Sequence, residues 1–243
     1  MASPPPPTVA ITGASGALGQ ALIRRWHRRG VPVIALTHRR DGQDAPPLRV
    51  LDAQGAVIPL RQAQWECGKE AELAPLLAAV DVLVLNHGVN PRTERDPDAL
   101  ALAVEVNALS PWRLLELFAR ELERRGATGE VWLNTSEAEI LPALSPLYEI
   151  SKRLIGQLYS LRALDLGARL RLRRLVLGPF RSALNPYGVM SADWVAGEIL
   201  RQVDWNCSLI LVSINPLVYV WMPLACLGRW AYNGLCTRAA ATP

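Results

Sequence analysis

The sequence predicts an α/β protein built on a doubly wound parallel sheet. Short apolar runs alternate along the chain with longer segments whose apolar residues recur at helical spacing, as in β-α-β units. The runs at residues 9–12, 33–36 and 82–85 lack polar alternation, which is typical of strands covered on both faces. At 243 residues, 50% of them hydrophobic, the chain can bury the core that such a sheet needs.

The other elements follow in order. A helix is expected over residues 17–29, where Gly30 ends it, and a long helix over residues 96–125. The helix that carries Tyr148 and Lys152 is expected to reach about Leu166. Further strands are expected at about residues 62–65, 131–134, 170–177 and 208–214.

Two segments lie outside this alternation. In residues 48–60, two apolar stretches flank the turn at residues 52–55, which predicts a small inserted hairpin. Residues 1–7 are a Pro-rich lead-in, which we expect to be disordered, without the basic and apolar parts of a secretory signal. We therefore expect a cytoplasmic protein with a catalytic domain at residues 8–214 and an apolar extension at residues 215–243.

Charge and cysteine content narrow the function classes. The net charge of +4 comes from arginine clusters at residues 24–29 and 169–174, which lack the interleaved aromatic residues of a nucleic-acid site. They fit solvated surfaces or an anionic partner such as a membrane, and we expect no nucleic-acid partner. The four cysteines and three histidines have no metal-ligand spacing, so we predict no metal site.

A glycine-rich turn follows the first predicted strand. Gly13 allows a tight turn, Gly16 allows the backbone to approach a pyrophosphate, and Gly19 allows close packing of helix on strand. The helix that follows offers N–H donors and a partial positive charge to phosphate groups. The predicted phosphate-binding residues are Gly13, Ser15, Gly16, Ala17, Leu18 and Gly19.

Tyr148 and Lys152 lie four residues apart, on one face of a helix. A tyrosine hydroxyl titrates near ~10, so it is a poor acid or base at neutral pH unless a nearby positive charge stabilises the phenolate. Lys152 can supply that charge. The spacing alone is also common on solvated helix faces, so the rest of the sequence decides its meaning.

With these motifs in this order, residues 8–213 resemble the short-chain dehydrogenase/reductase family, a Rossmann-like family of NAD(P)-dependent oxidoreductases. The pattern Thr-Gly-x-x-x-Gly-x-Gly at residues 12–19 is that of the family. Residues 86–88, Asn-His-Gly, match its segment beside the adenosine, with His87 and Val89 as departures. The other matching positions are Glu66, Asn86, Gly88, Asn107, Ser136, Tyr148 and Lys152.

The resemblance implies roles for these residues. Tyr148 is the implied general acid and base, while Lys152 lowers its pKa and holds the nicotinamide ribose. Ser136 is implied to position the substrate oxygen. Pro111 has no N–H to donate to the carbonyl of Asn107, so that oxygen could hold a water next to Lys152; alternatively, Pro111 only kinks the helix.

The end of the second strand predicts the cofactor. NAD-binding members of the family have a carboxylate there, whereas Thr37 is neutral and is followed by His38 and Arg39. We therefore expect NADP, with Thr37, His38 and Arg39 at the 2′-phosphate. Ser15 stands where NADP enzymes of the family usually have a basic residue. Pro179 and Ser182 are the expected contacts of the nicotinamide.

Two departures from the family concern the catalytic region. Ser136 is twelve residues before Tyr148. The family usually has its serine thirteen residues before the tyrosine, and that position is Thr135 here. Strand alternation places Thr135 on the opposite face, so we favour Ser136. Glu137 and Glu139 follow where a small residue is usual. They are either solvent-facing loop residues or groups that keep acidic substrates away. The second departure is the order Gly-Pro at residues 178–179.

The extension at residues 215–243 is too apolar for an ordinary tail. No charged residue occurs at residues 205–228, and prolines at 216 and 223 make a membrane span unfavourable. The alternatives are a helix in a homodimer interface and a helix inserted in one leaflet with Trp221, Trp230 and Tyr232 at the headgroups. We favour membrane attachment.

The resemblance therefore predicts an NADP-dependent oxidoreductase that reduces an apolar carbonyl substrate or oxidises the alcohol, and that forms a homo-oligomer. A non-catalytic NADP-binding sensor or scaffold with the same fold is the main alternative. Epimerases and dehydratases of the extended branch are a second alternative. They usually carry an additional carboxyl-terminal substrate domain, so we expect a dehydrogenase or reductase.

Overall fold

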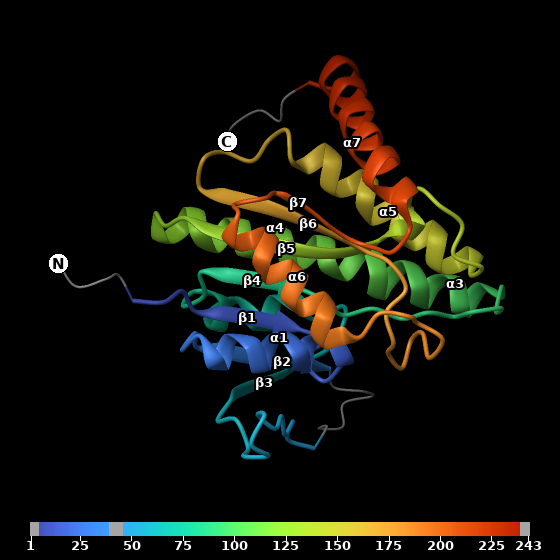
Figure 1. The fold of residues 1–243 in the computed structure, drawn as a ribbon. Helices are drawn as coiled ribbons and strands as arrows, with labels where there is room; N and C mark the ends of the chain where they lie inside the picture. The colour runs from blue at the N-terminus through green and yellow to red at the C-terminus, as the bar shows by residue number, and fades with distance from the viewer. Residues whose placement is uncertain (1–4, 39–45, 239–243) are drawn as a thin grey trace.

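The computed structural model describes residues 5–38 and 46–238, whose main feature is one parallel seven-stranded sheet (Figure 1). The strand order is β3-β2-β1-β4-β5-β6-β7. The predicted doubly wound α/β fold is confirmed. The strands are β1 Val9–Thr12, β2 Val33–His38, β3 Arg61–Trp65, β4 Val82–Leu85, β5 Gly129–Ser136, β6 Leu170–Leu177 and β7 Leu209–Val212.

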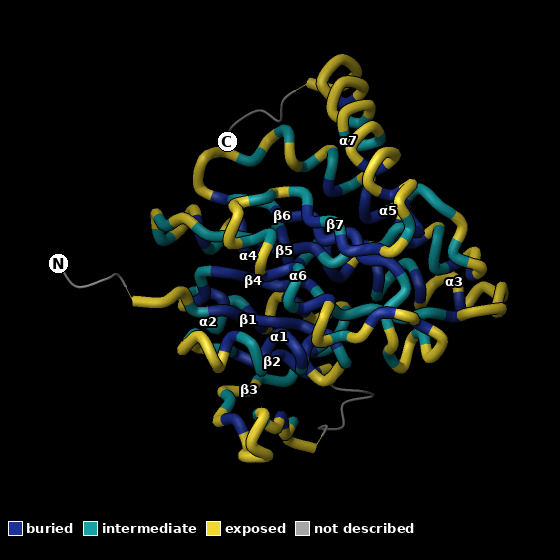
Figure 2. The backbone as a smooth tube through the Cα atoms, in the orientation of Figure 1, coloured by how far each residue is buried: buried dark blue, intermediate teal, exposed yellow. Residues whose placement is uncertain are grey.

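Helices cover both faces of the sheet because both faces of its strands are apolar. Side chains alternate along β1: Val9 and Ile11 pack in the core under α1 (Ala17–Arg28) and α6 (Ala192–Asp204), and Ala10 packs in the opposite core. α2 (Ala74–Leu77), α4 (Ser110–Arg125) and α5 (Pro146–Arg162) cover that second face. Figure 2 shows the buried sheet between these layers.

The chain changes direction at β1. After β1, β2 and β3 are laid down to one side, and β4 to β7 then extend from the other side of β1. Ligands of such sheets bind at the carboxyl ends of the strands, at this switch point. The topology therefore brings the loops after β1, β4, β5 and β6 to one edge, which we call the carboxyl edge.

The predicted long helix at residues 96–125 is interrupted. It consists of α3 (Pro97–Val104), a π-helical turn at Glu105–Leu109, and α4. The backbone N–H of Ser110 donates to Glu105, five residues back. Pro111 cannot donate to Asn107 in the ordinary way, so the wider turn has a local cause. The structure thus has a π-helical turn at the position where Pro111 was predicted to disturb the helix.

Some predicted boundaries differ from the structure. α5 ends at Arg162 rather than near Leu166. The apolar pattern continues beyond Arg162, but the backbone there forms turns. The small inserted hairpin is reduced to one antiparallel bridge, between Leu51 and Val57. The Asp52 carboxylate holds its turn by accepting from the backbone N–H groups of Gln54 and Ala56.

The last helix, α7 (Pro216–Cys236), packs on α5 and on β7 at the edge of the sheet (Figure 1). Val218 and Met222 are fully buried against Val176 of β6. The division of the chain after residue 214 stays a prediction.

Within residues 5–38 and 46–238, no helix is both long and apolar enough to span a bilayer.

Candidate active site

The glycine turn is packed so tightly that side chains would not fit. Gly13 has φ +61°, and a Cβ there would lie 2.8 Å from the carbonyl oxygen of Asn86. A Cβ at Gly19 would lie 2.4 Å from the carbonyl oxygen of Gly13. Gly16 is the N-cap of α1 and closes the turn by donating to Gly13. The first N–H groups of α1 have no intrahelical partner, so this cradle fits the pyrophosphate of a dinucleotide.

The remaining residues of this predicted phosphate site differ in exposure. Ser15 is exposed at the tip of the turn, and its carbonyl oxygen accepts from the side chain of Gln20. Ala17 is partly exposed in the first turn of α1, whereas Leu18 is buried in the core. Leu18 can therefore offer only its backbone to a ligand.

The adenosine end of the predicted site lies at the ends of β2 and β3. Thr37 is 6% exposed, and His38 ends β2 with its ring 6.0 Å from that of Trp65. Glu66 follows β3 directly and accepts from Lys69 at 2.9 Å. The structure thus brings the end of β3, which Glu66 follows, next to His38. Arg39 lies outside the described residues.

Asn86 and His87 join the end of β4 to the glycine turn. The Asn86 side chain donates to the carbonyl oxygen of Gly13 at 3.2 Å, and its backbone N–H donates to Thr12 Oγ1 at 2.9 Å. The Nδ1 atom of His87 lies 2.8 Å from the same hydroxyl. Burial lowers the pKa of His87 to about 3, so the ring is neutral at physiological pH. His87, which departs from the family pattern, is therefore a buried neutral residue that contacts the Thr12 hydroxyl at the end of β1.

Asn107 ties the loop after β4 to α5. Its side chain is 1% exposed; Oδ1 accepts from Val89 N–H at 2.9 Å, and Nδ2 donates to Val89 O at 2.9 Å and to Ser151 Oγ at 3.0 Å. Ser151 donates in turn to the Tyr148 carbonyl oxygen at 2.8 Å. Gly88 packs closely on this side chain, because a Cβ there would lie 3.0 Å from Asn107 Oδ1.

Tyr148 and Lys152 face the end of β5 from the first turns of α5. Lys152 Nζ lies 5.6 Å from the centre of the Tyr148 ring and donates to the Asn134 carbonyl oxygen at 3.2 Å. The Ser136 side chain lies close enough to the Tyr148 hydroxyl to lower its pKa. Thr135 instead points away, and its hydroxyl donates to the Leu175 carbonyl oxygen at 3.2 Å. The structure therefore brings together Ser136, Tyr148 and Lys152.

Burial opposes the charged forms of this pair. It raises the pKa of Tyr148, against the hydrogen bond from Ser136, which lowers it; the charge of Glu137 raises it further. Burial also lowers the pKa of Lys152 to about 8, against the charge of Glu139, which raises it. Lys152 is still mostly cationic at neutral pH, so it can stabilise a phenolate.

Pro179 and Ser182 lie in the loop after β6. The Pro179 carbonyl oxygen accepts from Val189 and Met190, and Ser182 Oγ accepts from the backbone N–H of Asn185. Ser182 therefore holds a local turn, and among the described residues no hydrogen bond joins it to Tyr148. Gly178 faces β7, because a Cβ there would lie 2.6 Å from Ser213 Oγ.

The solvent-facing alternative for Glu139 is wrong. Its side chain is fully buried and accepts from Arg174 Nη1 at 3.1 Å and from Arg229 Nη1 at 2.6 Å. It fits only because position 156 is glycine, where a Cβ would lie 2.0 Å from Glu139 Oε2. Glu137 is partly buried and accepts from Ser213 Oγ at 2.7 Å.

Two contributing residues were missed by the sequence analysis. Asn134 accepts from Lys152 through its carbonyl oxygen and donates from Nδ2 to Asn86 Oδ1 at 2.8 Å. Ser151 links Asn107 to α5. A polar residue at the end of an apolar strand was the available signal for Asn134; nothing local distinguishes Ser151 from other helix serines.

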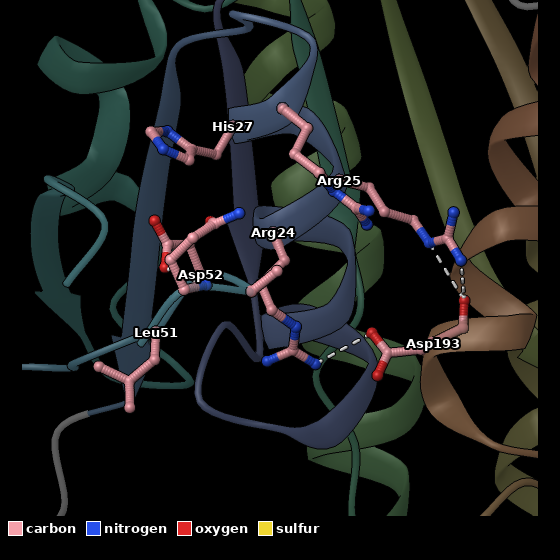
Figure 3. Close-up of a pocket in the computed structure, with 9 residues that line it drawn as sticks. Arg24, Arg25, His27, Leu51, Asp52 and Asp193 are labelled. Atoms are coloured by element: carbon pink, nitrogen blue, oxygen red, sulfur yellow. Dashed lines mark hydrogen bonds and ion pairs between the residues drawn. The ribbon is translucent and has the colours of Figure 1, made fainter. Parts of the chain in front are cut away.

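A surface hollow of ≈ 700 Å³ lies away from the carboxyl edge (Figure 3). It is bounded by the second half of α1, the turn near Asp52, and Asp193 of α6. Arg24 and Arg25 already donate to Asp193. None of the predicted site residues lines it. In the described ranges, no group of three or more His, Cys, Asp or Glu side chains could hold a metal ion.

Comparison with known proteins identifies the family. The model of the NAD dependent epimerase/dehydratase family matches residues 9–149, more than half of the chain. The chain belongs to this family. The chain is 46% identical to the monoglucosyldiacylglycerol epimerase of Synechocystis sp. over 218 residues. The aligned residues cover 89% of this chain and 51% of the relative. The chain thus spans about half the length of that curated relative.

Solved structures agree with this epimerase/dehydratase fold. A short-chain dehydrogenase from Sphingobium yanoikuyae in complex with NADPH has a TM-score of 0.74 at 20% identity, and 98% of each chain is covered. An alcohol dehydrogenase from Comamonas testosteroni specific for bulky-bulky ketones has a TM-score of 0.72 at 19% identity, with 97% of each chain covered. The resemblance to short-chain dehydrogenases is confirmed, and at these identities it shows the fold alone.

Proposed function

We propose that the chain transfers hydride at a sugar carbon of a glycosylated diacylglycerol, and that the net result is inversion of that carbon. The observation that carries this proposal is the 46% identity, over 89% of the chain, to a protein named monoglucosyldiacylglycerol epimerase. The proximity of Ser136 to the Tyr148 hydroxyl, with Lys152 beside the Tyr148 ring, supports it chemically. Because the chain covers 51% of that relative, its whole activity is part of the proposal.

Three side chains at the carboxyl edge would handle the proton. Tyr148 takes the proton of the sugar hydroxyl as the carbon loses hydride, and returns it when the resulting ketone is reduced from its other face. Lys152 stabilises the phenolate, and Ser136 donates a hydrogen bond to the reacting oxygen. A dinucleotide whose pyrophosphate lies in the glycine cradle would supply, through its nicotinamide, the chemistry of accepting and returning hydride. The C–H and O–H bonds broken in the first half are re-formed in the second, so no net oxidant is needed.

The predicted NADP-dependent dehydrogenase would carry out only the first half of this reaction, and a reductase only the second half. In either case the cofactor leaves the enzyme oxidised or reduced after each turnover, and the substrate is an apolar alcohol or carbonyl compound. The sensor alternative requires cofactor binding without turnover. Cofactor stoichiometry therefore separates the three functions.

The test uses the purified full chain with monoglucosyldiacylglycerol in detergent micelles and NADP or NAD below the substrate concentration. We expect conversion of the glucosyl headgroup to an epimer, without net reduction of the cofactor. The product sugar, galacto for C4 and manno for C2, identifies the inverted carbon. Net cofactor reduction would support a dehydrogenase instead, and cofactor binding without turnover would support a sensor.

Tyr148→Phe should lower turnover by about 10²–10⁴-fold while cofactor binding is kept, because the general acid and base is lost. Tyr159→Phe is the matched control. Tyr159 lies on the same helix, is 6% exposed and stacks on Arg174 rather than facing Ser136. Equal turnover of the Tyr148 variant and the wild type would contradict the assigned role.

We also propose that NADP is preferred over NAD. The support is a neutral, buried Thr37 where a carboxylate would bind the ribose 2′-hydroxyl, followed by His38 and by Arg39, the latter outside the described residues. Arg39→Asp should weaken NADPH binding much more than NADH binding, by at least ~10-fold in the ratio of dissociation constants, since it replaces a cation with an anion. Equal weakening of both would refute the preference.

A further inference from the structure

The outward face of α7 exposes large apolar side chains without a charged group. Most residues on this side are more than half exposed, among them Trp221 at 53%, Leu224 at 53% and Trp230 at 62%. Figure 2 shows α7 largely exposed apart from the strip that faces the protein. The other large exposed apolar residues of the helix are Leu217, Tyr219, Val220, Leu227, Tyr232 and Leu235.

The one charged residue within Pro216–Cys236 is turned inward. Arg229 is 11% exposed and pairs with the buried carboxylate of Glu139 at 2.6 Å. This ion pair fixes the rotation of α7 about its axis, since Val218 and Met222 are buried on the same side. The outward face is therefore both apolar and held in a defined orientation.

The loops after β5, β6 and β7 add exposed apolar side chains at the carboxyl edge, and we call Leu144, Tyr187 and Ile214 the apolar rim. Leu144, between Ser136 and Tyr148, is 94% exposed with φ +56°, a backbone region that leucine rarely adopts. Tyr187 of the loop after β6 is 90% exposed, and Ile214, just before α7, is 61% exposed. α7 joins this rim directly, because Val218 and Met222 pack with Ile140 and Leu141 of the loop before α5.

We propose that the outward face of α7 and the apolar rim of the carboxyl edge dock on a lipid bilayer, with α7 lying in one leaflet. Large apolar patches mark partner or membrane surfaces, and tryptophan and tyrosine are favoured at the headgroup level. A charge-free face that carries Trp221, Trp230 and Tyr232 fits an acyl and headgroup boundary. The docked site would then open toward the membrane surface.

The docking explains how a lipid substrate could be used, and this part rests on the proposed function. A glycosylated diacylglycerol keeps its acyl chains in the bilayer while its sugar projects from the surface. With the rim of the site against the headgroups, the sugar reaches Tyr148 and Ser136 without extraction of the lipid. A second copy of the chain is the competing occupant, and the test separates it from a bilayer.

The experiment is flotation of the purified full chain with phosphatidylcholine vesicles in about 0.5 M NaCl, which screens attraction through the arginine clusters. We expect the protein to float with the vesicles. Trp221→Glu and Leu224→Glu should each weaken binding at least about tenfold, because a charge enters the apolar boundary. The matched control is Trp205→Glu at the end of α6. Trp205 is 63% exposed, more than Trp221, and its replacement should leave vesicle binding unchanged.

A wild-type chain that stays with the soluble fraction at all vesicle concentrations would overturn the docking proposal. So would a dimer in solution that Trp221→Glu converts to monomer without any vesicle binding, because the face would then belong to a second copy. Epimerisation in detergent without vesicle binding removes the docking and leaves the proposed function. Vesicle binding without epimerisation supports the docking and removes the proposed function.

Discussion

Lys152 is the residue in which burial and chemistry oppose each other most clearly. Lys152 is 5% exposed, and its Nζ atom donates a hydrogen bond to the Asn134 carbonyl oxygen. Burial lowers its pKa to about 8 from the ordinary value of 10.5, and the buried charge of Glu139 opposes that shift. The folded protein therefore keeps a lysine cation at neutral pH at the expense of stability.

This opposition predicts a pH dependence of folding. Between about pH 8 and pH 10.5 the unfolded chain keeps a proton that folded Lys152 has released, so the free energy of unfolding should rise with pH through this group. Below that range both states are protonated, and the cost remains in full. In Lys152→Met the contribution is absent.

Urea unfolding of the cofactor-free protein measures this effect. The free energy of the wild type minus that of Lys152→Met should increase as the pH is raised across that range. A difference that stays flat would contradict the lowered pKa. The same variant should lose turnover, because the phenolate of Tyr148 then has no cation beside it.

At the scale of elements, the buried carboxylate of Glu139 adds an ion-pair link between α7 and the catalytic region to their apolar packing. Glu139, in the short 3₁₀ turn after β5, binds Arg174 of β6 and Arg229 of α7, and Arg174 also donates to the Gly156 carbonyl oxygen of α5. The surface that we propose to dock and the helix that carries Tyr148 thus share a buried ion cluster.

The cluster predicts unequal effects of its members. Glu139→Gln leaves two buried arginines without their counter-charge and should lower the free energy of unfolding by roughly 3–5 kcal/mol. Arg229→Met keeps the Glu139–Arg174 pair and should cost less, while amide exchange in α7 becomes faster than in α5. Uniform exchange in both helices would show that Arg229 does not fasten α7.

At the scale of the whole molecule, cofactor binding should stabilise the fold, because the cradle spans the ends of several strands. At a cofactor concentration of about one hundred times Kd the gain is ~2.7 kcal/mol, which for a chain of this size raises Tm by roughly 5–10 °C. NADP should give the larger shift when NAD is compared at equal concentration. Differential scanning fluorimetry measures both.

Gly16→Val supplies the matched control for this shift. Gly16 has φ −70°, which valine can adopt, and a Cβ there would lie 3.3 Å from the Gly13 carbonyl oxygen. The variant should fold but fill the cradle, so the cofactor-induced rise in Tm should be lost. A full shift in this variant would place the cofactor elsewhere.

Much of the fold could be predicted because its signals are local. The apolar runs, the glycine turn at residues 12–19 and the proline at 111 act on their immediate neighbours, and the structure has β1, α1 and the π-helical turn where these signals place them. Strand alternation also placed Ser136, rather than Thr135, on the side of Tyr148. The boundaries of α5 and the inserted hairpin were less accurate, because apolar spacing continues beyond the point where backbone hydrogen bonding stops.

The sequence by itself determined the α/β class, the family, and the order of the residues that meet at the carboxyl edge, because each depends on short-range patterns in the chain. The tertiary structure alone decided the environment of Glu139, whose partners Arg174 and Arg229 are 35 and 90 residues away. It also decided which side of α7 is buried. Charge burial and helix rotation depend on contacts between distant segments, and no local pattern encodes them.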